Sequence, residues 1–367
     1  MPLGELAERS NAAVLKTVSP QGLGGSNPSL SAKSRHGSIP EMTTRRTLLR
    51  ALCAGLIAPR LAFTQSAKMV TVAVLFAGES ENDGPAMRPF FDEMARLGWV
   101  EGRNIAYERL DGRGVREYIG GLAKSATSLV PDLIYTTTAS TAIAVLKESD
   151  TVPVVFVSSS NPVASGLVAS LSRPGGNATG AFQGSLGATA KRLELIRQVY
   201  PGARKFGVVI DRRSPDAARQ GTAYQVAARR MGFDLTVVQF TNFEAIHKIL
   251  ANFRRAGITA VGLTPSYTLL ARRHEVGEIA ARNRIALAGH RVEWADAGAL
   301  LTYGGDVADA LRRSARIVDR ILKGASPAGI PVEQATKTEL VVNRRTARAL
   351  GVTIPASLLG LADRVID

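Results

Sequence analysis

The stretch VPVVFVSSSNPVASGLVASLSRPGGNATG, residues 152–180, decides how the rest of the chain is interpreted. It begins with an apolar run at 152–157 that is rich in β-branched residues, which is typical of a strand buried on both faces of a parallel sheet. Small polar residues follow at 158–161, and residues 173–177 have the Pro and Gly of a tight loop. The stretch therefore predicts a buried strand that ends in hydroxyl groups and an amide. In open α/β sheets, ligands bind at this carboxyl end.

The alternation of strand and helix patterns continues on both sides of this stretch. Further strands are expected at 70–76, 105–109, 133–136, 205–210, 235–239, 260–263, 285–288, 299–304 and 337–342. Most are separated by helical patterns of ten or more residues, such as 115–129, 216–231 and 307–322. Such spacing predicts right-handed crossovers and parallel sheets, so the fold class is α/β.

The stretch 152–180 also resembles the signature of ABC-transporter substrate-binding proteins of the type that includes aromatic amino-acid binders. In that signature a strand, an Asp-Pro or Asn-Pro turn, GLV and RPGGN-x-TG follow in this order. Four more motifs support the resemblance: GWVEGRN at 98–104, RILKG at 320–324, PVEQ at 331–334 and ALGVTIP at 349–355.

The resemblance implies a periplasmic-binding-protein type I-like fold with two Rossmann-like lobes of parallel sheet joined by a hinge. It implies three crossings between the lobes, near Gly180, Leu301 and Asn343. We therefore expect one lobe at 68–180 plus 301–342 and the other at 181–300 plus 343–367.

Residues 1–67 are interpreted as a disordered extension followed by an export signal. The segment 19–38 is rich in Ser, Gly and Pro, and Arg45-Arg46 precedes a short apolar segment that contains the single cysteine, Cys53. The signal is of the twin-arginine or the general secretory type, and both predict a periplasmic protein. Removal of the signal would leave no thiol, which excludes a disulfide, a zinc–cysteine cluster and a cysteine nucleophile.

The formal net charge of +15 does not by itself indicate a nucleic-acid partner. Residues 1–67 hold eight Lys/Arg against three Asp/Glu, and the remaining excess is spread in pairs such as Arg229-Arg230 and Arg312-Arg313. Paired charges of this kind are typical of solvated helix faces.

Motifs for catalysis, metal binding and cofactor binding are missing from the sequence. It has no G-x-S-x-G elbow, no phosphate-binding loop with its Lys, no complete dinucleotide turn and no H-E-x-x-H pair. We therefore expect no enzyme activity, no metal and no cofactor. Among the histidines, only His290 is placed to reach a cleft, beside Arg291 and Glu293.

Polar residues that follow predicted strands are the candidate ligand-binding residues. They are Ser80, Thr137, Thr138, Ser159 and Asn161 in the first lobe, and Asp211, Ser266 and Tyr303 in the second set. The hydroxyls at 136–141 suit a bound anion at a helix N-terminus, and simple N-capping is the alternative. Asp211 is the candidate partner of a ligand ammonium group.

By resemblance, the chain is the extracytoplasmic solute-binding component of an ABC importer. It would act as a monomer, capture an amino acid or another small carboxylate between the lobes, and deliver it to a permease in the inner membrane. Two departures from the family pattern, SSSN at 158–161 and DRRS at 211–214, leave room for a more anionic ligand. A ligand-sensing domain and a Rossmann-like enzyme are the alternative functions.

Overall fold

The structure is a computed structural model that describes residues 69–78, 85–184 and 186–367. The predicted extension and export signal at 1–67, including Cys53, and the predicted site residue Ser80 lie outside these ranges. Within the described residues, no helix is both long enough and apolar enough to cross a membrane.

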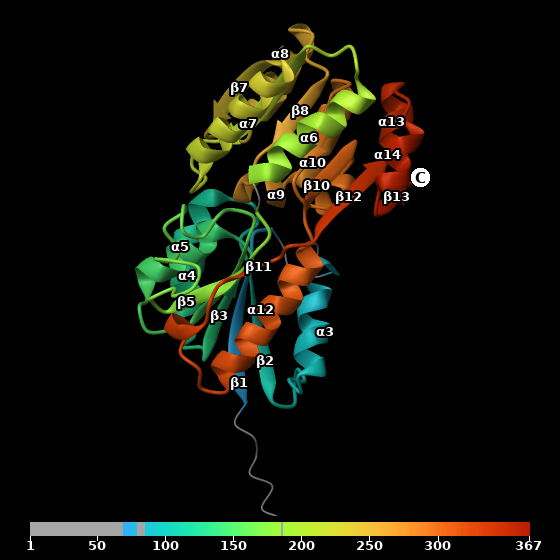
Figure 1. Ribbon diagram of the computed structural model, residues 1–367. Helices are drawn as coiled ribbons and strands as arrows, with labels where there is room; N and C mark the ends of the chain where they lie inside the picture. The colour runs from blue at the N-terminus through green and yellow to red at the C-terminus, as the bar shows by residue number, and fades with distance from the viewer. Residues whose placement is uncertain (1–68, 79–84, 185) are drawn as a thin grey trace, which may run out of the picture. The chain divides into compact units, whose positions relative to one another are not determined.

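The first sheet consists of six parallel strands in the order β11-β5-β4-β3-β1-β2. Its strands are β1 (Val70–Phe76), β2 (Ile105–Asp111), β3 (Leu133–Thr136), β4 (Val154–Ser158), β5 (Ala178–Phe182) and β11 (Glu333–Gln334). The helices of this lobe are η1 (Pro85–Met87), α3 (Arg88–Arg96), η2 (Arg116–Tyr118), α4 (Ile119–Ser128), α5 (Ala139–Glu148), α12 (Val307–Leu322) and η3 (Pro327–Gly329). Figure 1 shows α3 and α12 side by side against this sheet.

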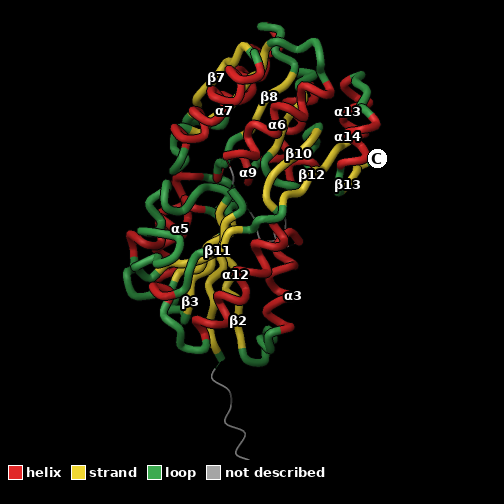
Figure 2. Tube along the Cα trace, viewed as in Figure 1, coloured by secondary structure: helices red, strands yellow, loops and turns green. Residues whose placement is uncertain are grey.

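The second sheet has the order β13-β12-β10-β9-β8-β6-β7. Its strands are β6 (Lys205–Asp211), β7 (Asp234–Phe240), β8 (Ala260–Leu263), β9 (Ala286–Gly289), β10 (Leu301–Gly305), β12 (Thr338–Asn343) and β13 (Arg364–Ile366). Its helices are α6 (Leu186–Val199), α7 (Ala217–Met231), α8 (Ala245–Arg255), α9 (Tyr267–Ala271), α10 (Arg273–Arg282), α11 (Glu293–Asp296), α13 (Arg344–Leu350) and α14 (Ala356–Leu361). Figure 2 shows the strands of each sheet covered by helices.

Alternation along the strands explains why each sheet is covered on both faces. In β1, Val72 and Val74 belong to a core with α3 and α12, whereas Ala73 and Leu75 belong to a core with α4 and α5. Successive side chains of a strand point to opposite faces, so a continuous apolar run requires cover on both sides. The second sheet likewise has two cores, one with α6 and α7 and the other with α8 and α10.

The chain crosses between the lobes three times, and each crossing lies a few residues from its predicted place. The first lies between β5 and α6, the second between β10 and α12, and the third between β11 and β12. The assignment of the whole range 301–342 to the first lobe is therefore wrong. Leu301 and Thr302 of β10 pair with β9, and β10 also pairs with β12, so both strands belong to the second sheet. Hydrogen-bonded neighbours decide a strand's sheet, and apolar periodicity does not report them.

Two further details of the sheets differ from the prediction. The pairing of β10 with β12 is antiparallel, in a fold that is otherwise parallel. The sequence ATGAF forms β5 although it lacks the large β-branched residues of a typical strand. Gly180 explains the small residues, because a Cβ there would lie 2.1 Å from the carbonyl oxygen of Phe156 on β4.

Candidate functional site

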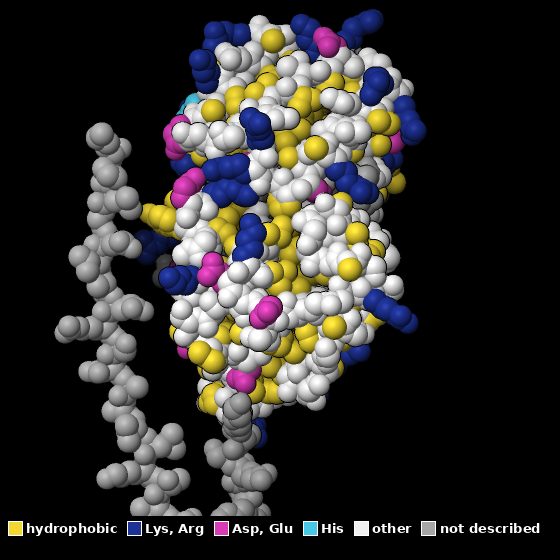
Figure 3. Space-filling model, turned by 90° about the vertical axis from the view of Figure 1, so that its left-hand side faces the viewer, with side chains coloured by type: hydrophobic (Ala, Val, Ile, Leu, Met, Phe, Trp, Pro, Cys, Tyr) yellow, Lys and Arg dark blue, Asp and Glu magenta, His cyan; other side chains and the backbone are white. Residues whose placement is uncertain are grey.

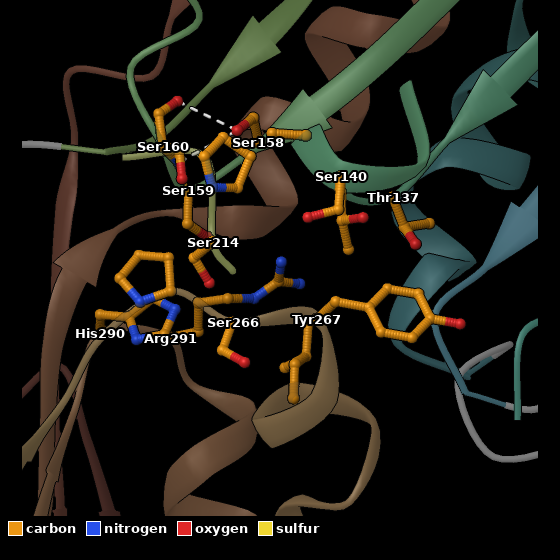
Figure 4. Close-up of a pocket in the computed structure, with 15 residues that line it drawn as sticks. Thr137, Ser140, Ser158, Ser159, Ser160, Ser214, Ser266, Tyr267, His290 and Arg291 are labelled. Carbon is orange, nitrogen blue, oxygen red and sulfur yellow. Dashed lines mark hydrogen bonds between the residues drawn. The ribbon is translucent and has the colours of Figure 1, made fainter. Parts of the chain in front are cut away.

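A small cavity lies where the carboxyl ends of strands from both sheets meet (Figure 4). From the first lobe it is lined by Thr137, Thr138, Ala139, Ser140, Ser158, Ser159 and Ser160. From the second lobe it is lined by Ser214, Pro215, Pro265, Ser266, Tyr267, Leu270, His290 and Arg291. Its volume is about 30 Å³, which is room for roughly two water molecules.

A second cavity of about 40 Å³ adjoins the first and shares Thr137, Leu270 and Arg291 with it. It is also lined by Arg273 and Glu293 and by apolar side chains such as Met87 and Leu311. The first cavity is thus lined mainly by hydroxyl groups, and the second adds apolar side chains beside charged ones.

Thr137 and Thr138 place hydroxyl groups at the start of α5. The Thr138 Oγ1 atom caps the helix by accepting from the Thr141 backbone N–H at 3.2 Å, and Thr137 Oγ1 donates to the Leu75 carbonyl at 3.2 Å. N-capping, the simpler interpretation of this segment, is therefore present. Both residues also line the cavity, where the positive end of the α5 dipole favours an anion.

The three serines after β4 have different roles. Ser158 Oγ closes a turn by donating to the Ser160 carbonyl at 3.0 Å. Ser159 Oγ accepts from Gln183 Nε2 at 3.1 Å, which leaves its own proton for a further acceptor. Ser160 Oγ donates to Asp216 Oδ1 of the second lobe at 3.0 Å. The cluster therefore supplies both a cavity-lining hydroxyl and a contact between the lobes.

The second lobe contributes Ser266 and Arg291. Ser266 Oγ caps α9 and donates to Asp211 Oδ2 at 2.8 Å. Arg291 pairs with Glu293, and Figure 4 shows its guanidinium pointing into the space between the two sets of side chains. Burial alone would raise the pKa of Glu293, but the Arg291 charge and hydrogen bonds lower that pKa on balance.

Of the predicted site residues, Thr137, Thr138, Ser159 and Ser266 line the first cavity, whereas Asn161, Asp211 and Tyr303 line neither cavity. Asn161 Oδ1 instead accepts from the backbone N–H groups of Val163 and Ala164 at 3.0 and 2.9 Å. Tyr303 lies on β10, where its hydroxyl donates to Thr338 Oγ1 at 3.2 Å.

Asp211 is fully buried and already bonded. It accepts from Ser266 Oγ and, at 3.0 Å, from the backbone N–H of Arg213, whose guanidinium lies 3.7 Å away. The structure therefore does not place this carboxylate where a ligand ammonium group would reach it.

Other cavity-lining residues were not among the predicted site residues, and they include Ser214, Tyr267, His290 and Arg291. His290 directly follows β9, and the sequence already indicated it as the histidine placed to reach a cleft. Tyr267 lies among the polar residues that follow β8, so the strand-end rule could have selected it with Ser266. It is buried against Ala77 and Ile119 of the first lobe, and a Cβ at Gly112 would lie 1.9 Å from its hydroxyl oxygen.

Positively charged side chains lie around the cavity. His290 has a pKa well below its usual 6.5, first because it is buried and then because the charges of Arg192 and Arg291 lie near it. Burial also lowers the pKa of Arg116, which bonds Ser140 Oγ at 3.3 Å and the Arg213 carbonyl of the other lobe. In the described part of the chain, no group of three or more His, Cys, Asp or Glu residues is arranged to hold a metal ion.

The family model of ABC transporter substrate binding proteins matches residues 72–366. The chain belongs to this family. A tyrosine-binding protein from Clostridioides difficile strain R20291 is 23% identical over 288 residues, which cover 78% of this chain and 82% of that protein.

Two solved structures share the fold of this family member. The ABC domain from Streptococcus pneumonia, in complex with L-Trp, has a TM-score of 0.74 at 20% identity, with 82% of this chain and all of that chain covered. A conserved domain protein from Vibrio cholerae has a TM-score of 0.74 at 23% identity, with coverages of 81% and 100%. The predicted α/β fold with two lobes of the periplasmic-binding-protein type is thereby confirmed.

Proposed function

We propose that this protein is the extracytoplasmic solute-binding component of an ABC importer. It captures an amino acid or another small carboxylate between its lobes and delivers it to a permease in the inner membrane. Export through the leader at 1–67 and action as a monomer, without enzymatic turnover and without a nucleic-acid partner, belong to the same proposal. Membership of the family and the tyrosine-binding relative support it.

The observation that carries the proposal is the composition of the cavity. Hydroxyl groups and a helix N-terminus from the first lobe face Arg291 from the second, so a small anion would be bonded by both lobes at once. The apolar side chains of the adjoining cavity, such as Met87 and Leu311, suit the hydrocarbon part of the same molecule. A ligand held this way stabilises the arrangement in which the lobes meet, because the binding groups converge only there.

Contacts beside the cavity support closure of the lobes as the binding event. Ser160 bonds Asp216, and Arg213 forms an ion pair with Glu117 at 2.8 Å. A groove next to this pair is lined by residues of both lobes, including Arg113 and Arg272. Lys and Arg side chains are spread over the face shown in Figure 3, which agrees with solvated charges on both lobes.

The test is a binding screen on protein from which residues 1–67 have been removed. Amino acids, aromatic acids and aliphatic carboxylates are screened by thermal shift, and calorimetry measures Kd for those that stabilise the protein. A ligand at 100 times its Kd should stabilise the folded state by about 2.7 kcal/mol. The proposal is wrong if none of these compounds binds, or if the purified protein converts a bound compound into a product.

A pair of variants tests whether the cavity is the binding site. The double variant Arg291→Gln/Glu293→Gln removes the cation without leaving a buried carboxylate unpaired, and it should weaken binding of a carboxylate at least tenfold. Arg173→Gln, at an exposed position away from the cavity, is the matched control and should leave Kd unchanged.

A further inference from the structure

His290 is a buried, cavity-lining histidine whose Nδ1 atom has no hydrogen-bond partner among the described residues. Its ring lies beside the Leu263 backbone, at the end of β8. A buried polar atom left without a hydrogen-bond partner, as Nδ1 is, costs free energy.

The surroundings of His290 keep its ring neutral. Arg291 is its chain neighbour, and Arg192 lies close enough to disfavour a second positive charge. Arg192 is buried as well, with its guanidinium bonded to the Tyr303 carbonyl at 2.8 Å and to Thr189 Oγ1 at 2.9 Å. A neutral imidazole carries one ring proton, so one of its two ring nitrogens is free to accept a hydrogen bond.

The backbone holds His290 in one place. A Cβ at position 304 would lie 2.0 Å from the His290 carbonyl oxygen, so glycine at this position of β10 lets the two strands' ends approach closely. The backbone that carries the imidazole is thus held in place by close packing. A second buried atom without a partner among the described residues, Ser214 Oγ, lies in the same cavity.

We propose that His290 determines specificity by accepting, at Nδ1, a hydrogen bond from a hydroxyl or amino group of the ligand, while Arg291 attracts the ligand's carboxylate. This inference rests on the proposed function and narrows it. The ligand class is a small acid that also carries a hydrogen-bond donor, that is, an amino acid or a hydroxy acid. A site with a buried acceptor rejects an analogue that lacks the donor, because the acceptor then stays unpaired.

Three matched pairs of ligands test this specificity by calorimetry. L-Phenylalanine and 3-phenylpropionate differ by the amino group, L-3-phenyllactate and 3-phenylpropionate by a hydroxyl, and L-tyrosine and L-phenylalanine by the phenol. We expect the compound with the donor to bind at least tenfold more tightly in one or more pairs. His290→Phe, which removes the acceptor, should reduce that preference to threefold or less.

Two further variants serve as controls for His290→Phe. His290→Asn retains a polar atom attached to Cγ, as Nδ1 is, and should keep most of the preference even if His290→Phe folds poorly. His247→Phe, at an exposed histidine on α8, should keep all of it.

The outcomes separate the two proposals. Binding without a tenfold preference in any pair, or a preference that His290→Phe leaves intact, overturns the role of His290 while the proposed function stands. Failure of all the compounds of the pairs and of the wider screen to bind overturns the proposed function and this inference with it.

Discussion

The hydrogen bond between Ser160 and Asp216 makes a quantitative test of lobe closure. Ser160 Oγ of the first lobe donates to Asp216 Oδ1 of the second at 3.0 Å, and both residues are buried, with exposed fractions of 4% and 5%. If the lobes separate without ligand, both groups become hydrated, and the bond forms only on closing. Ser160→Ala then removes a bond to a charged group, worth about 1.5 to 3 kcal/mol.

If ligand binds only the closed form, this loss appears in the affinity. The apparent Kd is the intrinsic Kd divided by the fraction of closed protein, so Ser160→Ala should raise Kd roughly 10- to 100-fold. The assay is calorimetry with the tightest ligand of the screen. Ser170→Ala, which loses a hydroxyl on an exposed loop, is the control and should leave Kd unchanged.

A double-mutant cycle separates this bond from any direct contact of Ser160 with ligand. Asp216 does not line the first cavity, so Asp216→Asn changes the bond alone, leaving the Gln220 side chain at 3.2 Å as a neighbour. Ser160→Ala should cost at least about 1 kcal/mol less in the Asp216→Asn protein than in the parent. The reasoning is refuted if Ser160→Ala stays within twofold of the parent, or if the two changes are additive.

Three other predictions follow from the same structure. Ligand affinity should be constant from about pH 8 to pH 5.5, because burial and the charges of Arg192 and Arg291 hold the pKa of His290 well below 6.5. Calorimetric titrations at a series of pH values check this. A change of affinity near pH 6.5 that is absent in His290→Asn would contradict it. Hydrogen bonds from Arg96, then from Arg316, lower the pKa of Glu93 from 4.5 to about 2, although burial opposes them. The contribution of Glu93 to the stability of the folded protein is therefore complete above pH 4.5 and is lost as the pH falls towards 2. Glu93→Gln should lower the free energy of unfolding at pH 7 by about 1 to 2 kcal/mol, discounted for its exposed arginine partners, and should flatten the acid branch in urea titrations. Gly180→Ala should destabilise the protein by more than about 2 kcal/mol, because its Cβ would meet the Phe156 backbone. Gly176→Ala, with open space around it, is the control and should change the free energy of unfolding by less than about 1 kcal/mol. Equal urea midpoints for the two variants would refute the close packing of β5.

The sequence alone determined the elements that depend on local periodicity. The run 152–157 predicts β4, and the amphipathic pattern at 307–322 predicts α12, because burial on two faces or on one stripe leaves a repeating apolar pattern. Thr137, Ser159 and Ser266 were likewise found as polar residues after strands. Parallel strands end at one edge of a sheet, so this rule brings together residues far apart in the chain.

Only the tertiary structure decided which lobe each late segment joins and which polar residues reach the cavity. Leu301–Gly305 was predicted as a strand, but its pairing with β9 depends on a partner that periodicity does not report. Asp211 and Ser266 looked equivalent as residues after strands, yet Asp211 is enclosed by Ser266 and the Arg213 backbone. Tyr267 packs into the first lobe, where it meets Gly112. A cavity between two lobes is a property of surfaces brought together in space, and no local pattern along the chain encodes which side chains will face it.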